Sequence, residues 1–364
     1  MHIGILGGGQ LARMLALAGH PLGLRFRVLE PASECPAAVV TDHVRGEYED
    51  YQALYRFCQG LDVVTYEFEN VPVESARWLA ERVPVYPTPK GLEVGQERVA
   101  EKTFFQDLGI AVPPFAAVES REQLDAAVAR IGLPAVLKTT RFGYDGKGQA
   151  VLRTPADVEQ AWLLLGGRPL ILEGYVLFDR ELSILAVRGR GGEQAFYPLV
   201  ENVHRAGILR KSTAPAPDLR PALQAQAERI AGRALEALGY VGVLAVELFQ
   251  VGETLLVNEM APRVHNSGHW TIEGAETSQF ENHVRAVAGL PLGPTTSRGH
   301  SVMLNLIGSW PDPAAVLAVP GVHLHLYGKS PRPNRKVGHV TIRGDSVAVA
   351  AATERMAGLV ADSV

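Results

Sequence analysis

Short apolar runs alternate with helical patterns over the first 90 residues. Period-two and continuous apolar runs predict strands, and apolar residues spaced three and four apart predict helices. The predicted elements alternate between strand and helix at residues 2–6, 11–18, 26–29, 51–58, 61–66, 73–82 and 83–86. This alternation is typical of an open α/β sheet. Prolines at positions 84, 87 and 89 then mark a boundary, so we predict an N-terminal α/β domain over residues 1–97.

Two further units follow in the pattern. A helix over 98–108 opens the second, which continues to residue 172 with a helix over 120–131 capped by Ser120. The third covers 173–364, with strands at 181–187, 194–200, 300–307 and 322–327 and helices at 219–238, 278–288, 314–319 and 346–359. We therefore predict an α/β protein with α+β elements.

Two carboxylates occupy strand positions in the stretch 244–270. We predict two strands joined by a tight turn around 251–253, with Glu247 in the first and Glu259 in the second. The acids share a face only if the turn is odd-numbered or a bulge shifts the register there. A three-residue loop with Gly252 in the left-handed conformation would do this, whereas a two-residue turn would separate the acids. Buried together they favour Mg²⁺, which binds carboxylates and phosphates; the alternative is edge-strand acids that reach solvent.

A polar loop follows the second acid directly. Arg263, His265 and Asn266 lie within four residues. None has metal-ligand spacing to a partner, so zinc is not indicated. Such a loop suits a small oxyanion such as bicarbonate or phosphate. A second basic loop, residues 327–336, is interpreted either as a solvated loop or as a clamp on an anionic substrate.

Two glycine-rich turns are candidates for phosphate binding. The first, at residues 7–12, satisfies the dinucleotide fingerprint with Glu30 about 20 residues on. It indicates an NAD site, a simple tight turn or a phosphate site at the helix start. The second, at residues 141–149, has three glycines and two cations and follows Lys138, which favours a flap over phosphates rather than a mobile hairpin. Glu69 and Asn70 follow the third predicted strand. Either residue could have a functional role, and Asn70 could instead cap a helix.

Composition narrows the class of protein. The chain has 364 residues, a net charge of −4 and no long basic run, so nucleic acid is not an implied partner. No apolar stretch reaches the roughly 20 residues of a membrane span, and residues 1–10 lack a signal-peptide pattern. Two cysteines match neither a disulfide framework nor a metal cluster. We therefore expect a cytoplasmic enzyme or binding protein.

The order of these motifs resembles the ATP-grasp enzymes, and among them the N5-carboxyaminoimidazole ribonucleotide synthetases of purine biosynthesis. The resemblance covers essentially the whole chain. It rests on GGGQLARM at 7–14, GYDGKGQ at 143–149, glutamates 173 and 181, NEMAPRVHNSGHW at 258–270 and RPNRKVGH at 332–339. It implies an ATP-grasp fold with a Rossmann-like N-terminal domain (1–97), a small ATP-grasp subdomain with the flap (98–172), and a large subdomain with a small C-terminal extension (173–364).

The resemblance also implies residue roles. For ATP and its phosphates it implies Arg98, Lys138, Gly143, Tyr144, Asp145, Gly146, Lys147, Gly148 and Gln149. For adenine, ribose and the remaining nucleotide contacts it implies Glu173, Gly174, Tyr175, Val176, Glu181, His204, Asn258 and Glu259. For magnesium it implies Glu247 and Glu259, and for the bicarbonate side Arg263, His265 and Asn266. For aminoimidazole ribonucleotide it implies Gly8, Gly9, Gln10, Tyr144, Asp145, Lys329, Arg335 and Lys336.

The implied reaction joins bicarbonate to 5-aminoimidazole ribonucleotide with ATP and Mg²⁺, through carboxyphosphate, in a homodimer. His265 and Asp145 are candidates for orienting bicarbonate or moving its proton, and Lys329 is assigned with them to the catalytic group. Two residues depart from the usual pattern: Ala12 replaces a glycine, and Glu30 stands where aspartate is common. Alternatives are an ATP-grasp ligase that uses formate, an NAD-dependent oxidoreductase and a non-catalytic nucleotide sensor.

Overall fold

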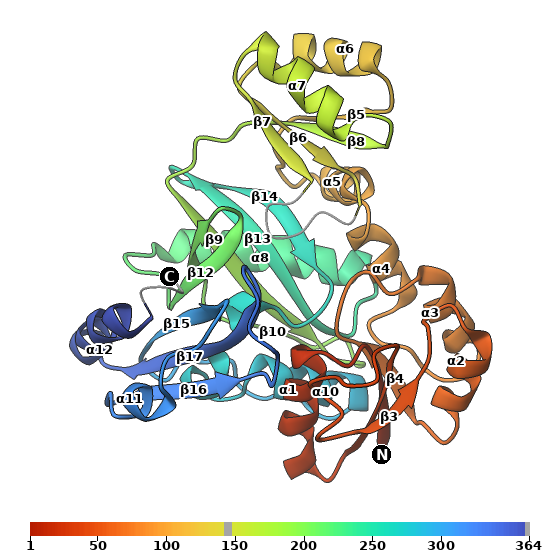
Figure 1. The fold of residues 1–364 in the computed structure, drawn as a ribbon, viewed down its shortest axis with the longest axis vertical. Helices are drawn as coiled ribbons and strands as arrows, with labels where there is room; N and C mark the ends of the chain where they lie inside the picture. Colours follow the sequence, from red (N-terminus) through yellow and green to blue (C-terminus); the bar gives the residue numbers. More distant parts are fainter. Residues whose placement is uncertain (142–147, 361–364) are drawn as a thin grey trace.

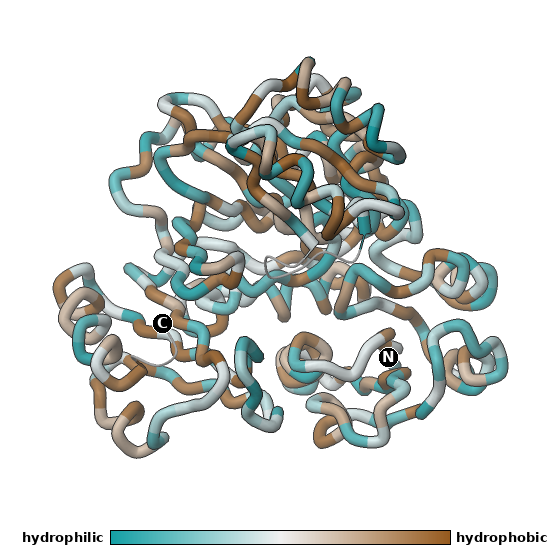
Figure 2. The backbone as a smooth tube through the Cα atoms, turned by 45° about the horizontal axis from the view of Figure 1, so that its top comes forward, coloured by the Kyte–Doolittle hydropathy of each residue, from teal (hydrophilic) through white to brown (hydrophobic). Residues whose placement is uncertain are grey.

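Three sheets organise the computed structural model, which describes residues 1–141 and 148–360 (Figure 1). The small lobe with α6 (Arg121–Ile131) and α7 (Pro155–Leu165) stands at the top of that view, and the N-terminus lies in the lower part. Hydrophobic and hydrophilic residues alternate closely along the chain in Figure 2, as expected for elements buried on one side. Among the described helices, none combines the length and apolar character needed to cross a membrane.

The first sheet is parallel, with strand order β3-β2-β1-β4. Its elements are β1 (His2–Leu6), α1 (Gln10–Gly19), β2 (Arg25–Glu30), β3 (Asp42–Arg45), α2 (Tyr51–Cys58), β4 (Val63–Tyr66), α3 (Val73–Ala80) and α4 (Pro89–Gly95). The predicted strand at 83–86 was wrong, since Val85 forms only an isolated bridge to Val64. Pro84 and Pro87 flank this bridge and lack the N–H groups a ladder needs.

The second sheet is small and antiparallel, in the order β5-β8-β6-β7. Helix α5 (Arg98–Asp107) leads into it, and α6 and α7 cover it. Its strands are β5 (Phe115–Val118), β6 (Ala135–Thr139), β7 (Gln149–Leu152) and β8 (Leu170–Gly174). Ser120 caps α6 by accepting from the backbone N–H of Gln123, so the predicted cap is confirmed.

The third sheet has nine strands in the order β14-β13-β9-β11-β12-β15-β17-β16, with β10 beside β9. Its strands are β9 (Arg180–Arg188), β10 (Gln194–Phe196), β11 (Val200–Arg205), β12 (Ile208–Ala214), β13 (Gly242–Val251), β14 (Thr254–Ala261), β15 (His300–Ile307), β16 (Val322–Leu326) and β17 (Lys336–Gly344). Its helices are α8 (Pro221–Ala237), α9 (Thr271–Gly274), α10 (Gln279–Ala288), α11 (Pro313–Leu317) and α12 (Ser346–Leu359). The predicted strand at 194–200 was wrong, because β10 ends at Phe196 and β11 begins at Val200.

The β13–β14 hairpin brings the two predicted acids to one face. Glu247 pairs directly with Glu259, and the register shifts between Glu247 and Leu248, which pairs with Val257. Asn258 is therefore the extra residue of a bulge. The three-residue loop was wrong: Val251 pairs with Thr254 across a two-residue turn, although Gly252 is left-handed with φ of 58°. The two-residue turn alone would put the acids on opposite faces. The extra residue of the bulge brings them to the same face.

A buried histidine joins the first sheet to the third. His283 of α10 lies between Thr65 of β4 and Val243 of β13. Its Nδ1 accepts the Val243 N–H at 3.1 Å, so its Nε2–H donates to the Thr65 hydroxyl at 2.8 Å. Burial lowers the pKa of His283 to about 3, which keeps the ring neutral. This bridge fixes the N-terminal sheet beside the hairpin and so forms one side of the site.

Candidate functional site

A cleft of about 660 Å³ lies where the three sheets meet. Most predicted site residues line it: Gln10, Arg98, Lys138, Gln149, Tyr175, Glu181, His204, Glu247, Asn258, Glu259, Arg263, His265, Asn266 and Lys336. Other described predictions do not line it: Gly8, Gly9, Gly148, Glu173, Gly174, Val176, Lys329 and Arg335. Five predictions lie outside the described residues: Gly143, Tyr144, Asp145, Gly146 and Lys147.

The hairpin acids are electrostatically unequal. Burial and then the charge of Glu259 raise the pKa of Glu247 to about 7. Burial also acts to raise the pKa of Glu259, but Arg98 and Lys138 outweigh it and lower that pKa. Arg98 Nη1 lies 3.0 Å from Glu259 Oε2. A hard divalent cation between two such facing acids would offset their repulsion and favour the ionised form of both.

A buried ion-pair group lies behind the hairpin, at the end of β6. Lys138 donates to Glu173 at 2.8 Å, and Lys102 of α5 lies 3.8 Å from the same oxygen. Lys102 also donates to the backbone carbonyl of Asn258, the bulge residue. The Glu173 side chain is only 4% exposed, so its carboxylate holds the two lysines rather than facing the cleft. Lys102 had not been singled out from sequence, because a lysine in an amphipathic helix usually lies on the solvated face.

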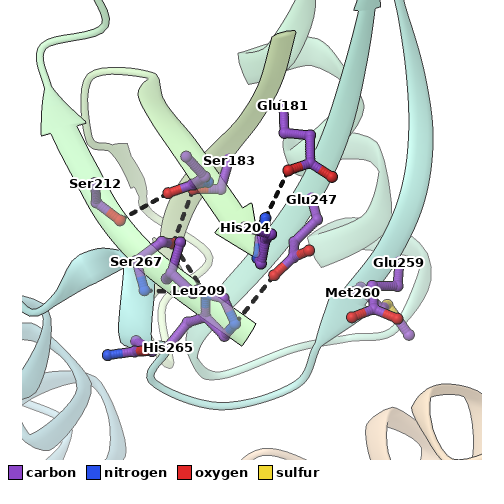
Figure 3. Close-up of polar contacts among 12 residues, drawn as sticks. Glu181, Ser183, His204, Leu209, Ser212, Glu247, Glu259, Met260, His265 and Ser267 are labelled. Atoms are coloured by element: carbon purple, nitrogen blue, oxygen red, sulfur yellow. Dashed lines mark hydrogen bonds and ion pairs between the residues drawn. The ribbon is translucent and has the colours of Figure 1, made fainter. Parts of the chain in front are cut away.

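A carboxylate–histidine pair lies beside the hairpin, on the next two strands of the same sheet. Glu181 of β9 and His204 Nδ1 of β11 are 2.6 Å apart (Figure 3). Burial acts to lower the pKa of His204, but the hydrogen bond to Glu181 and the charge of Glu247 raise it overall. Tyr175, after β8, is 39% exposed at the cleft.

The polar loop after β14 contacts the N-terminal sheet. Arg263 Nε donates to Glu69, which follows β4. Burial raises the pKa of Glu69, but this ion pair outweighs it and lowers the pKa to about 2. The capping alternative for Asn70 was wrong, since the N-cap of α3 is Pro72. Both residues left open there, Glu69 and Asn70, line the cleft, and Glu69 contacts Arg263 in it.

The next two loop residues are held by β13 and β15. His265 Nε2 lies 3.2 Å from Glu247 Oε1, and burial followed by the Arg263 charge lowers the pKa of His265 well below its usual value. Asn266 exchanges side-chain amide hydrogen bonds of 3.0 and 2.7 Å with Asn305. The sequence placed this loop beside the second acid; the structure adds that His265 contacts the first.

The first glycine turn is occupied by the chain's own carboxylates. Glu67 accepts the N–H groups of Gly9 and of Ala12, the latter at 2.9 Å. Glu30 accepts the Gly8 N–H at 3.0 Å, which explains the acid at the end of β2. A dinucleotide pyrophosphate needs these donors, so the NAD alternative is not supported. Glu67, which directly follows β4 and also lines the cleft, was missed because nothing in the sequence shows that it reaches the start of α1.

Comparisons with known proteins agree with this geometry. Family models match as "ATP-grasp domain" at residues 103–280, "Ribonucleotide synthetase preATP-grasp domain" at 1–96 and "Phosphoribosylaminoimidazole carboxylase C-terminal domain" at 301–353. The N5-carboxyaminoimidazole ribonucleotide synthase of Pseudomonas aeruginosa is 57% identical over 343 residues, which cover 94% of each chain. That of Brucella melitensis is 48% identical over 93% of this chain and 95% of its own.

Solved structures show the same likeness over nearly the whole chain. The synthetase of Thermus thermophilus is 63% identical with a TM-score of 0.95 and covers 98% of each chain. The Aspergillus clavatus synthase in complex with ADP and 5-aminoimidazole ribonucleotide is 30% identical with a TM-score of 0.93, over 99% of this chain and 98% of its own. The chain has the ATP-grasp fold and belongs to the N5-carboxyaminoimidazole ribonucleotide synthases.

Proposed function

We propose that this chain catalyses the carboxylation of 5-aminoimidazole ribonucleotide to N5-carboxyaminoimidazole ribonucleotide. ATP and bicarbonate are consumed, and ADP and phosphate are released through carboxyphosphate. The observation that carries this proposal is the meeting of two chemistries in one cleft: the carboxylate pair Glu247–Glu259 and the loop of Arg263, His265 and Asn266. The first suits a nucleotide–metal complex, and the second suits a small oxyanion.

ATP would lie between the small sheet and the β13–β14 hairpin. Arg98 and Lys138 would contact its phosphates together with the flap 143–149, and Glu173 would position Lys138 for this contact. Residues 173–176 would hold adenine, with Glu181 and His204 on the ribose side and Asn258 beside the phosphates. Glu247 and Glu259 would hold Mg²⁺, which supplies charge neutralisation at the transferred phosphoryl group.

In the described part of the chain, no cluster of three or more His, Cys, Asp or Glu side chains forms a metal cage. Proteins nevertheless often supply only one or two carboxylates to Mg²⁺, because phosphate oxygens and water complete its coordination shell. Bicarbonate, oriented by Arg263 and Asn266, would attack the γ-phosphate in line. The flap 143–149 would keep water away from carboxyphosphate, which hydrolyses readily.

The ribonucleotide would occupy the side of the cleft next to the N-terminal sheet. Lys329, Arg335 and Lys336 would bind its phosphate, with Tyr144, Asp145 and the Gly8-Gly9-Gln10 turn around the rest of the molecule. Lys329 is close enough to Glu67 for its charge to act on that carboxylate, which supports the placement of the basic loop over this turn. Asp145, which lies outside the described residues, would orient bicarbonate or move its proton.

The division into residues 1–97, 98–172 and 173–364 remains our assignment of the domains, supported by the separate sheets. We also propose a homodimer and a cytoplasmic location, on the ground of family membership alone.

ADP release tests the proposed function directly. Turnover should require bicarbonate and the ribonucleotide together, and omission of either should reduce ADP release to background. An enzyme that turns over with formate but not with bicarbonate would be a different ATP-grasp ligase. ATP binding without any turnover would indicate a nucleotide sensor.

A further inference from the structure

Four buried polar side chains form a hydrogen-bonded chain that ends on His265 (Figure 3). They come from separate elements: Ser212 from β12, Asn202 from β11, Ser183 from β9 and Ser267 from the turn after β14. Ser212 is 2.7 Å from Asn202, Asn202 is 2.9 Å from Ser183, and Ser183 is 2.8 Å from Ser267. Ser267 Oγ lies 2.9 Å from His265 Nδ1. The three serines are fully buried and Asn202 is 5% exposed, so solvent does not compete for these bonds.

Such a chain can run in either direction, because hydroxyls both donate and accept and an amide can be turned over. Its two ends decide the direction. The backbone N–H of Ser267 points at His265 Nδ1 at 3.3 Å, and a backbone N–H cannot accept. A neutral imidazole carries one hydrogen, so Nε2, which lies 3.2 Å from Glu247 Oε1, holds it. Nδ1 is therefore the lone-pair nitrogen and Nε2 carries the hydrogen.

With the ends settled, every bond in the chain has one donor. Ser212 donates to Asn202 Oδ1, and Asn202 Nδ2 donates to Ser183. Ser183 donates to Ser267, which leaves the Ser267 hydroxyl hydrogen for Nδ1. No member has to share or lose a hydrogen, as expected for a fully satisfied buried network.

We propose that this serine–asparagine chain is a positioning device that holds His265 as its Nε2–H tautomer and thereby aims Glu247. The lone pair of His265 faces the buried Ser267, so this nitrogen is turned away from the cleft. The other nitrogen, which carries the hydrogen, lies 3.2 Å from Glu247 Oε1. His265 thus orients the carboxylate proposed above as a Mg²⁺ ligand, instead of taking the proton of bicarbonate. Hydrogen bonds of this kind orient ligands and tune their affinity for metals. The proposal rests on the proposed function only in taking Glu247 as a cation ligand.

The tautomer can be measured without any turnover. The full-length protein labelled with ¹⁵N in its histidine rings should show, for His265, an unprotonated Nδ1 and a protonated Nε2. The signal is assigned by its loss in His265→Asn. A protonated Nδ1 with a bare Nε2 would overturn the proposal, and so would a fast average of the two tautomers. A wild-type protein that shows the expected tautomer but no ribonucleotide-dependent turnover would refute the proposed function and leave this inference standing.

Serine variants test whether the chain acts on the metal site. Ser267→Ala removes the 2.9 Å bond to Nδ1 and leaves only the longer backbone contact, so the Nδ1 signal should shift. The Mg²⁺ concentration for half-maximal rate should rise about ten-fold, with the KM for the ribonucleotide unchanged. Ser183→Ala, one bond further away, should have a smaller effect in the same direction.

Ser301 of β15 provides the matched control. It is a fully buried serine of the same sheet, and its hydroxyl has no hydrogen-bond partner among the described residues. Ser301→Ala should leave the His265 signal and the Mg²⁺ dependence unchanged. Equal effects of Ser267→Ala and Ser301→Ala would mean that any buried hydroxyl matters only for packing, which would contradict the proposal.

Discussion

Glu247→Gln should make the protein more stable without metal while abolishing its turnover. Glu247 faces Glu259 directly across the hairpin and is only 15% exposed. In the absence of a cation, its charge is therefore disfavoured in the folded state. Glutamine has nearly the same shape and keeps a side-chain oxygen, so the change removes mainly the charge.

The size of the effect follows from the pKa of Glu247. Folding raises it from 4.5 to about 7, and one pKa unit corresponds to about 1.4 kcal/mol. An acid with a raised pKa destabilises the fold increasingly as pH rises from its unfolded to its folded value, and no further above that. The charge therefore costs about 3 kcal/mol at pH 8 and about 1 kcal/mol at pH 5.5. Glu247→Gln should recover most of this cost.

Thermal unfolding in EDTA measures the gain. At pH 8 the variant should melt several degrees above the wild type, and the difference should shrink at pH 5.5. The control is Glu253→Gln in the turn of the same hairpin, where the acid is 76% exposed and pairs with exposed Arg220. Its unfolding free energy should change by less than about 0.5 kcal/mol. A Glu247→Gln protein that is no more stable than wild type, or that turns over normally with Mg²⁺ and ATP, would refute the reasoning.

Three further variants test other contacts. Glu259→Gln should also abolish turnover but should lower stability, because Arg98 and Lys138 favour that carboxylate; thermal unfolding in EDTA would distinguish it from Glu247→Gln. Glu69→Gln should cost about 3 kcal/mol at pH 7, since the Glu69 pKa falls from 4.5 to about 2. This stabilisation is lost as pH falls, so the cost of the substitution should be about 2 kcal/mol smaller at pH 3. Denaturant unfolding at both pH values measures the difference in unfolding free energy between wild type and variant. The same difference at pH 7 and pH 3 would contradict the ion pair with Arg263. Lys329→Ala should raise the KM for the ribonucleotide with little change in the KM for ATP, and the reverse pattern in steady-state kinetics would place this loop on the ATP side.

The β13–β14 hairpin shows what the alternation of apolar and polar residues can predict and what it cannot. Strict alternation along β13 and β14 was enough to predict that Glu247 and Glu259 share a face only with an odd register. It did not locate the odd residue, because an extra residue in the turn and a bulge at Asn258 have the same effect on parity. Composition of the loop after β14 likewise predicted a polar site, since Arg263 and His265 are only two residues apart.

Residues that act together across strands were not predictable in this way. Ser183, Asn202 and Ser212 are each ordinary polar residues in strands, and they meet because β9, β11 and β12 are neighbours in the sheet. The strand β12 itself was not predicted, since Arg210 and Lys211 interrupt its apolar pattern. Chain order does not give sheet order, and without it the buried network around His265 has no sequence signal.

Oxygen transfer from bicarbonate to phosphate tests the central claim most directly. If bicarbonate attacks the γ-phosphate of ATP, one oxygen of the bicarbonate ends in the released phosphate. Turnover of the wild-type protein with ¹⁸O-labelled bicarbonate, ATP, Mg²⁺ and 5-aminoimidazole ribonucleotide should therefore yield ¹⁸O-labelled phosphate, detected by mass spectrometry. The amount of phosphate released should equal the amount of N5-carboxyaminoimidazole ribonucleotide formed. Phosphate that carries no ¹⁸O above the unlabelled control, while ADP is still formed, would contradict the account.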